Sequence, residues 1–329
     1  MPTLMQAPAK TILVGIDEAG YGPILGPLVV SATAWEVPTD RAEDCLWQTL
    51  RRSVSQTASG RQARIAILDS KQLFRRKNGL APLERSVLAV LAAWCGRQPA
   101  MTPLLDALCP EAPAKLAEYP WYRDVNPTLP RSADAAAIRI AASLLNSDMA
   151  DHSVRIAGCW SEILPEGHYN RLIDQTKNKS VALYGLVLRL IHRIGGAFPR
   201  HGLRIMVDKL GAKSHYGPGL MRAFEDRHLR VIAEDQDHSA YEMVTGPSSW
   251  RVSFTRSGDS RYMPVAMASL ISKYLREILM GCFNAYWSRH VADLKPTAGY
   301  YQDGLRFLGD IRDHARRMNV GRDILIRQR

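Results

Sequence analysis

A short apolar run that ends on two adjacent acids and a glycine-rich turn constrains the fold of this chain more than any other segment. The run is residues 11–16 (TILVGI), and Asp17 and Glu18 follow it. Short, β-branched apolar runs are typical of buried strands. The glycines and prolines of residues 20–27 let the backbone approach a ligand before a second predicted strand, 28–35. Neighbouring strand residues point to opposite faces, so both acids can serve one site only if the strand ends there. A polar turn with two solvated acids is the alternative.

The order of apolar patterns predicts an α/β protein. Strand-like runs occur at 11–16, 28–35, 64–68, 153–158, 203–207 and 229–233. Helical patterns occur near 83–95, 134–148, 179–195, 216–226, 264–289 and 301–317. Strands that alternate with helices favour a layered arrangement, and 46% hydrophobic residues suffice for a large core. We expect one elaborated domain over residues 1–329.

Three further acidic segments lie next to predicted strands or helices. Residues 69–73 (DSKQL) follow the apolar run 65–68, Asp208 ends the run 203–207, and Asp259 precedes the helical pattern that begins at 264. Taken alone, Asp208 is typical of a strand-end turn and Asp259 of a helix N-terminus.

Taken in order, these segments resemble type 2 ribonuclease H, the family of ribonuclease HII and its archaeal and eukaryotic relatives. Residues 17–27 (DEAGYGPILGP) resemble the family's D-E-A-G-R-G-x-x-x-G-P, with Tyr21 in place of arginine, and residues 69–73 resemble D-S-K-x-L. Residues 206–211 (MVDKLG), with Tyr216 and Leu220, resemble the archaeal and eukaryotic branch. Residues 258–277 (GDSRYMPVAMASLISKYLRE) resemble A-D-x-K-Y-P-V-V-x-A-A-S-I-x-A-K-V-x-R-D, and 295–300 (KPTAGY) resemble K-G-Y, although Gln302 replaces a threonine. The resemblance implies a ribonuclease H-like fold, with a mixed central sheet flanked by helices and a helical C-terminal part over 264–329.

The resemblance also implies a catalytic metal centre. It assigns four metal-binding carboxylates, Asp17, Glu18, Asp208 and Asp259. Carboxylate oxygens suit Mg²⁺ or Mn²⁺, and two such ions could activate water and stabilise the departing 3′ oxygen. Without metal the four acids should repel one another and raise one another's pKa, which predicts a poorly organised site.

Substrate contacts follow from the same resemblance. Gly20 and Gly22 flank the place where the family's backbone meets the 2′-hydroxyl, Tyr300 matches a tyrosine that stacks on the neighbouring sugar, and Lys71 and Lys273 match phosphate-holding lysines. Tyr21 cannot supply the charged fork of the family's arginine, so phosphate binding is weakened or moved elsewhere. Surface lysines are the alternative for Lys71 and Lys273.

Residues 269–277 receive weaker expectations. Ser269 is expected to serve helix packing. Glu277 is either an auxiliary acid or, with Arg276, part of a solvated face.

The implied activity is endonucleolytic hydrolysis of the RNA strand of RNA–DNA hybrids, or of the phosphodiester beside ribonucleotides embedded in duplex DNA, leaving 5′-phosphate and 3′-hydroxyl ends. A formal charge of +11 favours such a polyanionic partner. Two alternatives stay open: a nuclease of this fold with altered substrate choice, and a noncatalytic binder of hybrid or structured nucleic acid.

Extra length separates this chain from compact members of the family. We expect an insertion at about 98–151 and a second elaboration at about 234–257, in which 250–254 (WRVSF) alternates like an edge strand. Trp121 and Tyr122 are expected to anchor their loop to the core, and stacking on nucleotides by Trp121, Tyr122 and Arg123 is the alternative. Asp235 and Asp237 are expected to form turns.

Cysteine usage and hydropathy bear on location. The five cysteines form no C-x-x-C pair, which favours a reducing compartment. The N-terminus lacks an apolar signal core, and apolar runs are shorter than the ~20 residues of a membrane span. We therefore expect a soluble, cytoplasmic protein without a membrane partner.

Overall fold

A seven-stranded mixed sheet forms the centre of the molecule. The computed structural model describes residues 9–57, 64–74, 79–96, 100–123, 126–246 and 248–328. The sheet has the strand order β5-β2-β1-β6-β9-β8-β7. Its strands are β1 (Lys10–Ala19), β2 (Leu28–Pro38), β5 (Arg155–Leu164), β6 (Gly202–Asp208), β7 (His228–Glu234), β8 (His238–Thr245) and β9 (Ser248–Thr255). β1 pairs antiparallel with β2 and parallel with β6, which pairs parallel with β9. β3 (Val54–Ser55) and β4 (Ile65–Ala66) form a separate short ladder.

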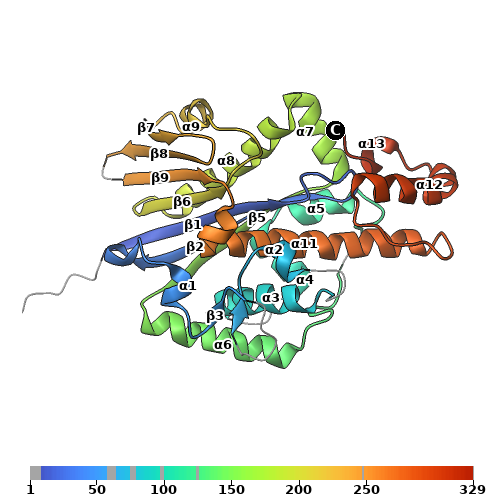
Figure 1. Cartoon of the computed structure of the whole chain (residues 1–329). Coiled ribbons are helices and arrows are strands. Elements are labelled where there is room, and N and C mark those ends of the chain that lie inside the picture. The colour runs from blue at the N-terminus through green and yellow to red at the C-terminus, as the bar shows by residue number, and fades with distance from the viewer. Residues whose placement is uncertain are drawn as a thin grey trace, which may run out of the picture.

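Helices pack on both faces of this sheet (Figure 1). The helices of the described residues are η1 (Thr39–Arg41), α1 (Leu46–Thr49), α2 (Ser70–Leu73), α3 (Ala81–Cys95), α4 (Met101–Leu108), α5 (Ala112–Ala117), α6 (Ala135–Asp151), α7 (Glu166–Thr176), α8 (Lys179–Ala197), α9 (Gly217–Ala223), α10 (Gly258–Arg261), α11 (Met263–Ser288), α12 (Tyr301–Arg317) and α13 (Arg322–Leu325). α11 lies on one face, against β1 and β2, and α3 and α6 form a further layer beyond it. α7, α8 and α9 share a hydrophobic cluster with the opposite face.

Alternation along β1 sends its side chains to these two layers. Ile12, Val14 and Ile16 join the cluster beneath α8, and Leu13 joins the cluster beneath α11. At Gly15 the start of α11 comes so close that a Cβ would lie 2.0 Å from the carbonyl carbon of Pro264. A glycine is therefore required there, and it lets α11 run beside the end of β1.

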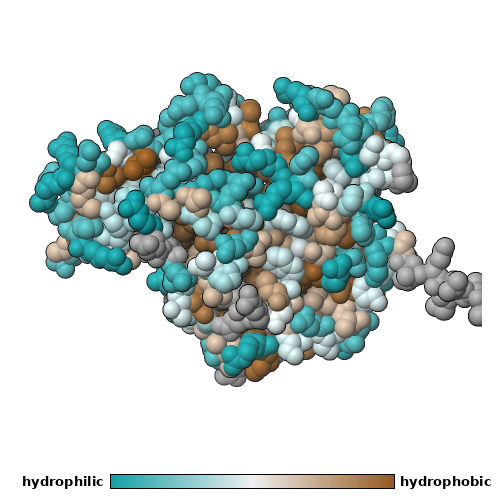
Figure 2. Space-filling view, turned by 180° about the vertical axis from the view of Figure 1, so that it is seen from behind, coloured by the Kyte–Doolittle hydropathy of each residue, from teal (hydrophilic) through white to brown (hydrophobic). Residues whose placement is uncertain are grey.

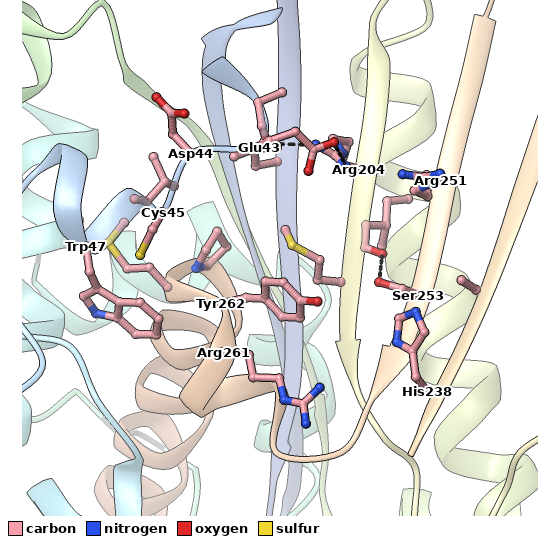
Figure 3. Close-up of a pocket in the computed structure, with 18 of the residues that line it drawn as sticks. Glu43, Asp44, Cys45, Trp47, Arg204, His238, Arg251, Ser253, Arg261 and Tyr262 are labelled. Atoms are coloured by element: carbon pink, nitrogen blue, oxygen red, sulfur yellow. Dashed lines mark hydrogen bonds and ion pairs between the residues drawn. The ribbon is translucent and has the colours of Figure 1, made fainter. Parts of the chain in front are cut away.

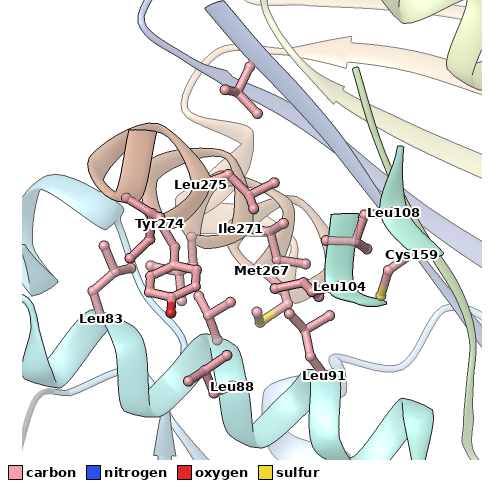
Figure 4. Packing of buried hydrophobic residues seen from close by; sticks show 14 of the residues in the cluster. Leu83, Leu88, Leu91, Leu104, Leu108, Cys159, Met267, Ile271, Tyr274 and Leu275 are labelled. Atoms are coloured by element: carbon pink, nitrogen blue, oxygen red, sulfur yellow. The ribbon is translucent and has the colours of Figure 1, made fainter. Parts of the chain in front are cut away.

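The outer layer is held by apolar packing between α3, α4 and α11 (Figure 4). Leu88 and Leu91 of α3 lie opposite Met267 and Ile271 of α11, and all four side chains are fully buried. Apolar burial of this kind stabilises by about 25 cal/mol per Å² removed from water. Outside the core, hydrophilic residues cover most of the face shown in Figure 2.

The structure confirms the predicted fold class: a mixed sheet between helices, with a helical C-terminal part. The prediction of an edge strand at 250–254 is wrong, because β9 lies between β6 and β8. The predicted strand at 64–68 shrinks to β4, and α7 and β8 were not predicted.

The two elaborations contain more regular structure than their loop signals indicate. Segment 98–151, whose first two residues lie outside the described part of the chain, holds α4 and α5 as well as the predicted alanine-rich helix α6. Trp121 and Tyr122 are each 2% exposed, which confirms them as anchors. Asp235 forms the expected turn by accepting hydrogen bonds from the N–H groups of Asp237 and His238, both at 2.8 Å. In the ranges that the structure describes, no helix is both long and apolar enough to cross a membrane.

Candidate active site

The first two candidate acids lie where β1 extends past the end of β6. β1 pairs with β6 as far as Ile16 opposite Val207, whereas its pairing with β2 continues to Ala19. Asp208 follows Val207 as the last residue of β6. The prediction that the strand ends at the two acids is wrong, because β1 continues through Asp17 and Glu18 to Ala19. It is β6 that ends beside them, at Asp208.

A short turn brings the fourth acid to the same place. After β9, Ser257 adopts a left-handed conformation with φ 54°, and α10 begins at Gly258. The Gly258 N–H donates to Asp208 Oδ1 at 2.7 Å, which ties the start of α10 to the end of β6. Asp259, the second residue of α10, thereby joins Asp208.

Burial raises the pKa of all four carboxyl groups. For Asp17 the causes are burial, then the charges of Glu18 and Asp208, and the pKa lies well above its ordinary value. Burial and Asp208 raise the pKa of Glu18 to about 7. Burial also raises the pKa of Asp208, and the charge of Asp259 adds to that rise. Burial raises the pKa of Asp259 as well, and the charge of Asp69 adds to that rise. The pKa values are raised, as expected from the sequence, but burial contributes more to the rise than repulsion between the acids does.

The short helix α2 adds opposite charge to this cluster. Lys71 lies near enough to lower the pKa of Glu18, Asp208 and Asp259. The N-cap Asp69 accepts a hydrogen bond from the Lys71 N–H at 2.7 Å. The sequence reasoning used Asp69 only as part of a motif, whereas the structure makes it a fifth acid beside the cluster.

Helix α11 supports Asp17 from the sheet face that it covers. The Ser272 hydroxyl donates to the Asp17 carbonyl at 3.0 Å. The Ser269 hydroxyl lies close enough to the Asp17 carboxyl to lower its pKa, and it donates to the hydroxyl of Ser70 in α2 at 3.1 Å. Ser269, expected to serve packing alone, therefore also joins α2 and α11 to the acids.

The chemistry of these side chains fits a hard divalent cation. All four candidate ligands are carboxylates, the donors that Mg²⁺ and Mn²⁺ prefer. Buried carboxyl groups with raised pKa values favour either a proton or a cation. Within the described ranges, no three His, Cys, Asp or Glu side chains form a ready metal-binding group.

A glycine-rich loop follows the first two acids, and the residue before Tyr300 contacts this loop. Gly20 has φ +91°, and a Cβ there would lie 2.5 Å from Arg276 Nε, so only glycine fits. Gly22 is exposed and faces open space. Tyr21 packs partly against the core. The pKa of Tyr21 is raised, first by burial, then by Tyr169 and then by Glu18. The Ile24 N–H donates to the Gly299 carbonyl at 2.8 Å, next to Tyr300, which is 57% exposed.

The remaining predicted contact is differently placed. The Lys273 ammonium lies 2.7 Å from the Glu277 carboxylate and over the ring of Phe74 at 4.8 Å, so its charge is already paired. The expectation that Arg276 shares a solvated face is wrong, because the Arg276 side chain is 2% exposed. It donates to the Leu25 carbonyl at 3.0 Å.

A separate cavity of about 430 Å³ lies between the β6, β8 and β9 strands and the start of α11 (Figure 3). None of the ten predicted site residues lines it. Its cationic residues include Arg204, which pairs with Glu43, and Arg261, two residues after Asp259. The acids and the glycine loop therefore lie outside this cavity.

Comparisons with known proteins give similarity in structure alone. No family model and no curated protein match the sequence. Among solved structures, the chain is similar to ribonuclease HII from Archaeoglobus fulgidus in its PCNA complex, at 16% identity over 97% of this chain and 94% of that one, with a TM-score of 0.45. It is similar to ribonuclease H2 from Pyrococcus horikoshii at 13% identity over 96% and 92%, with a TM-score of 0.41. It is also similar to Bst-RNase HIII in complex with Mn²⁺, at 16% identity over 99% and 70%, with a TM-score of 0.45.

Proposed function

We propose that this chain is a metal-dependent endoribonuclease of the type 2 ribonuclease H kind. It hydrolyses the RNA strand of RNA–DNA hybrids, or the phosphodiester beside ribonucleotides embedded in duplex DNA, and leaves 5′-phosphate and 3′-hydroxyl ends. The observation that carries the proposal is that Asp208 interacts with Asp17, with Glu18 and with Asp259 near adjacent strand and helix ends, and that each of the four carboxyl groups has a raised pKa. Buried like charges destabilise a fold, so their assembly favours a functional role.

In this proposal the four carboxylates hold two Mg²⁺ or Mn²⁺ ions. When bound, such ions activate a water molecule and stabilise charge on the departing 3′ oxygen. Asp17 and Asp208 are fixed by backbone donors, the N–H groups of Glu18 at 2.8 Å and Gly258 at 2.7 Å. Lys71 supplies positive charge beside the acids and is placed to hold a substrate phosphate.

Sugar selection is assigned to the other side of the site. The exposed Gly22 leaves its backbone N–H open to a 2′-hydroxyl, the group by which proteins distinguish RNA from DNA, and Gly20 provides the tight backbone turn before it. Tyr300 offers an exposed ring for stacking on the adjacent sugar. Lys273 pairs with Glu277, and we assign this pair a structural role. Lys273 can contact a substrate phosphate only if this pair opens.

We further propose that residues 1–329 work as one elaborated catalytic domain, with 98–151 and 234–257 as additions to it. α4, α5 and α6 pack into the same hydrophobic cluster as α11, which supports this view.

Cleavage of end-labelled duplexes tests the function. The experiment compares three duplexes in Mg²⁺ and in Mn²⁺: DNA with one embedded ribonucleotide, a full RNA–DNA hybrid and all-DNA. Asp17→Asn serves as the inactive variant. Asp106→Asn, an exposed acid of α4, serves as the matched control. Cutting at the ribonucleotide or of the hybrid, lost only in Asp17→Asn, supports the proposal. Cutting of all-DNA indicates altered substrate choice, and binding without cutting indicates a noncatalytic binder.

A further inference from the structure

The last residues of the chain lie beneath the glycine-rich loop. α13 packs against α7, and residues 326–328 follow α13 beside these helices (Figure 1). The Asn170 side-chain amide of α7 donates to the carbonyls of Asp323 at 2.6 Å and Ile326 at 2.8 Å, and its oxygen accepts from the Gln328 N–H at 2.7 Å. The segment after α13 is therefore fixed against the body of the protein.

This fixed segment buries a guanidinium under the loop. Arg327 is 2% exposed, and its side chain lies 4.0 Å from the Tyr169 ring. The guanidinium donates to the carbonyl of Gly20 and, at 3.3 Å, to that of Tyr21, while the Arg327 N–H donates to the Ile24 carbonyl at 2.8 Å. One residue thus contacts three peptide groups of the loop.

Those contacts determine where the loop's N–H groups point. In a planar trans peptide the C=O and N–H bonds point in opposite directions. The Gly20 carbonyl shares its peptide with the Tyr21 N–H, and the Tyr21 carbonyl with the Gly22 N–H. Because both carbonyls point at Arg327, both N–H groups point away from it. Among the described residues the Gly22 N–H has no acceptor, and the space at Gly22 is open.

A second buried arginine adds positive charge under the loop. Arg276 donates to the carbonyls of Leu25 at 3.0 Å and Ala298 at 3.2 Å. The nearby carboxyl of Glu166 is fully buried and accepts from the Gly26 N–H at 3.1 Å. Glu277, which pairs with Lys273, is a second carboxyl near Arg276. Two guanidinium groups and one ammonium group against two carboxyl groups still give the underside of the loop an excess of positive charge, whereas Tyr21 itself carries none.

We propose that Arg327 is a positioning residue that aims the Tyr21 and Gly22 N–H groups at the substrate and, with Arg276, supplies from below the positive charge missing at position 21. The inference rests on the proposed function, because it takes a ribonucleotide-containing nucleic acid as the substrate. Arg327 does not touch the substrate, since the loop lies between them.

The test compares Arg327→Gln and Arg327→Lys with Arg322→Gln, an exposed arginine of α13. On a duplex with one ribonucleotide, kcat/KM should fall at least about tenfold in Arg327→Gln and less in Arg327→Lys, which keeps the charge but not the fork. Mn²⁺ affinity, measured by calorimetry, should not change in any of the three, which separates a positioning effect from general unfolding.

Amide hydrogen exchange of the peptide covering residues 20–26 provides a readout independent of turnover. In EDTA, binding of the same duplex should slow exchange in the wild type and in Arg322→Gln but not in Arg327→Gln. The inference would be overturned if Arg327→Gln showed the same amide exchange and the same kcat/KM as the wild type. An equal loss of kcat/KM in Arg322→Gln would also overturn it. If the wild type cleaves no duplex, the proposed function fails, whereas faster loop exchange in Arg327→Gln alone still supports the positioning role.

Discussion

Two buried acidic regions of the molecule differ in how their charges are satisfied. Glu84 of α3 is fully buried, and its carboxylate accepts four hydrogen bonds, from the N–H groups of Arg131, Ser132 and Ala133 and from the Tyr274 hydroxyl, at 2.6 to 2.9 Å. Asp17 is 7% exposed, and its carboxyl has the Glu18 N–H, the Ser269 side chain and other acids around it.

The difference separates structural acids from candidate catalytic ones. A carboxylate surrounded by donors stabilises the fold, because its lost hydration is replaced. A buried carboxylate beside others of the same charge lacks that replacement and favours a proton or a cation. Burial alone does not mark a functional acid. The balance between donors and neighbouring charges does.

The largest expected effect is on turnover at the acid cluster. Asp17→Asn or Asp208→Asn should lower cleavage by about a thousandfold or more, because loss of a metal ligand removes several kcal/mol of transition-state stabilisation. Single-turnover cleavage of a duplex with one ribonucleotide measures it. Turnover near the wild-type rate in either variant would show that the cluster is not the active site.

Stability should respond oppositely in the two regions. In Glu84→Gln an amide NH₂ must face backbone N–H donors, so the free energy of unfolding should fall by about 1–3 kcal/mol. In Asp17→Asn it should stay the same or rise, because a repelling charge is lost. Urea unfolding in EDTA at pH 7.5 measures both. Equal destabilisation by the two amides would remove the distinction between the regions.

The pH dependence of stability sharpens the same comparison. Glu18 has a pKa of about 7 in the folded protein, above the 4.5 of a free side chain, because of burial and Asp208. The folded state therefore holds a proton that the unfolded state releases, so this stability is present below about pH 4.5 and is lost as pH rises towards 7. In EDTA the free energy of unfolding should fall by about 1–3 kcal/mol over this interval, after allowance for solvent screening.

The control for that titration is Asp17→Asn, which removes one partner of the coupled acids and should show a weaker fall. Urea unfolding at several pH values compares the two proteins. A wild-type stability that rises over the interval would contradict the raised pKa values.

The smallest expected effect concerns the loop. Tyr21→Arg should raise kcat/KM at a single embedded ribonucleotide a few-fold, because an exposed guanidinium binds phosphate more strongly than a phenol does. Kinetics on the hybrid and on the single-ribonucleotide duplex measure the gain. An unchanged or lower value would indicate that Arg327 and Arg276 already supply the charge from below.

Local patterns explain why much of the fold could be predicted. Periodicity located the principal strands and long helices, and the family-like segments around Asp17, Asp208 and Asp259 lie where strands and a short helix end. The alternation in residues 250–254 indicated that β9 has one buried and one more exposed face, but the alternation contained no information about which strands lie beside β9. The edge prediction failed for that reason.

Contacts between distant residues explain what could not be predicted. Arg327 meets Tyr21 across 306 positions of sequence, and no local pattern marks such a pair. Arg276 looked like one more charged residue on a helix, and it is buried because the loops containing Leu25 and Ala298 close over it. The pairing of Lys273 with Glu277 is of the opposite kind, because the two residues lie four positions apart in one helix.

The most direct test of the distinction between the two acidic regions is calorimetric titration of Mn²⁺ into the wild type, Asp17→Asn and Glu84→Gln, at a temperature where all three are folded. The wild type and Glu84→Gln should bind Mn²⁺ alike, and Asp17→Asn should bind it much more weakly. Equal binding by Asp17→Asn, or no binding by the wild type, would contradict the assignment of these acids to a metal centre.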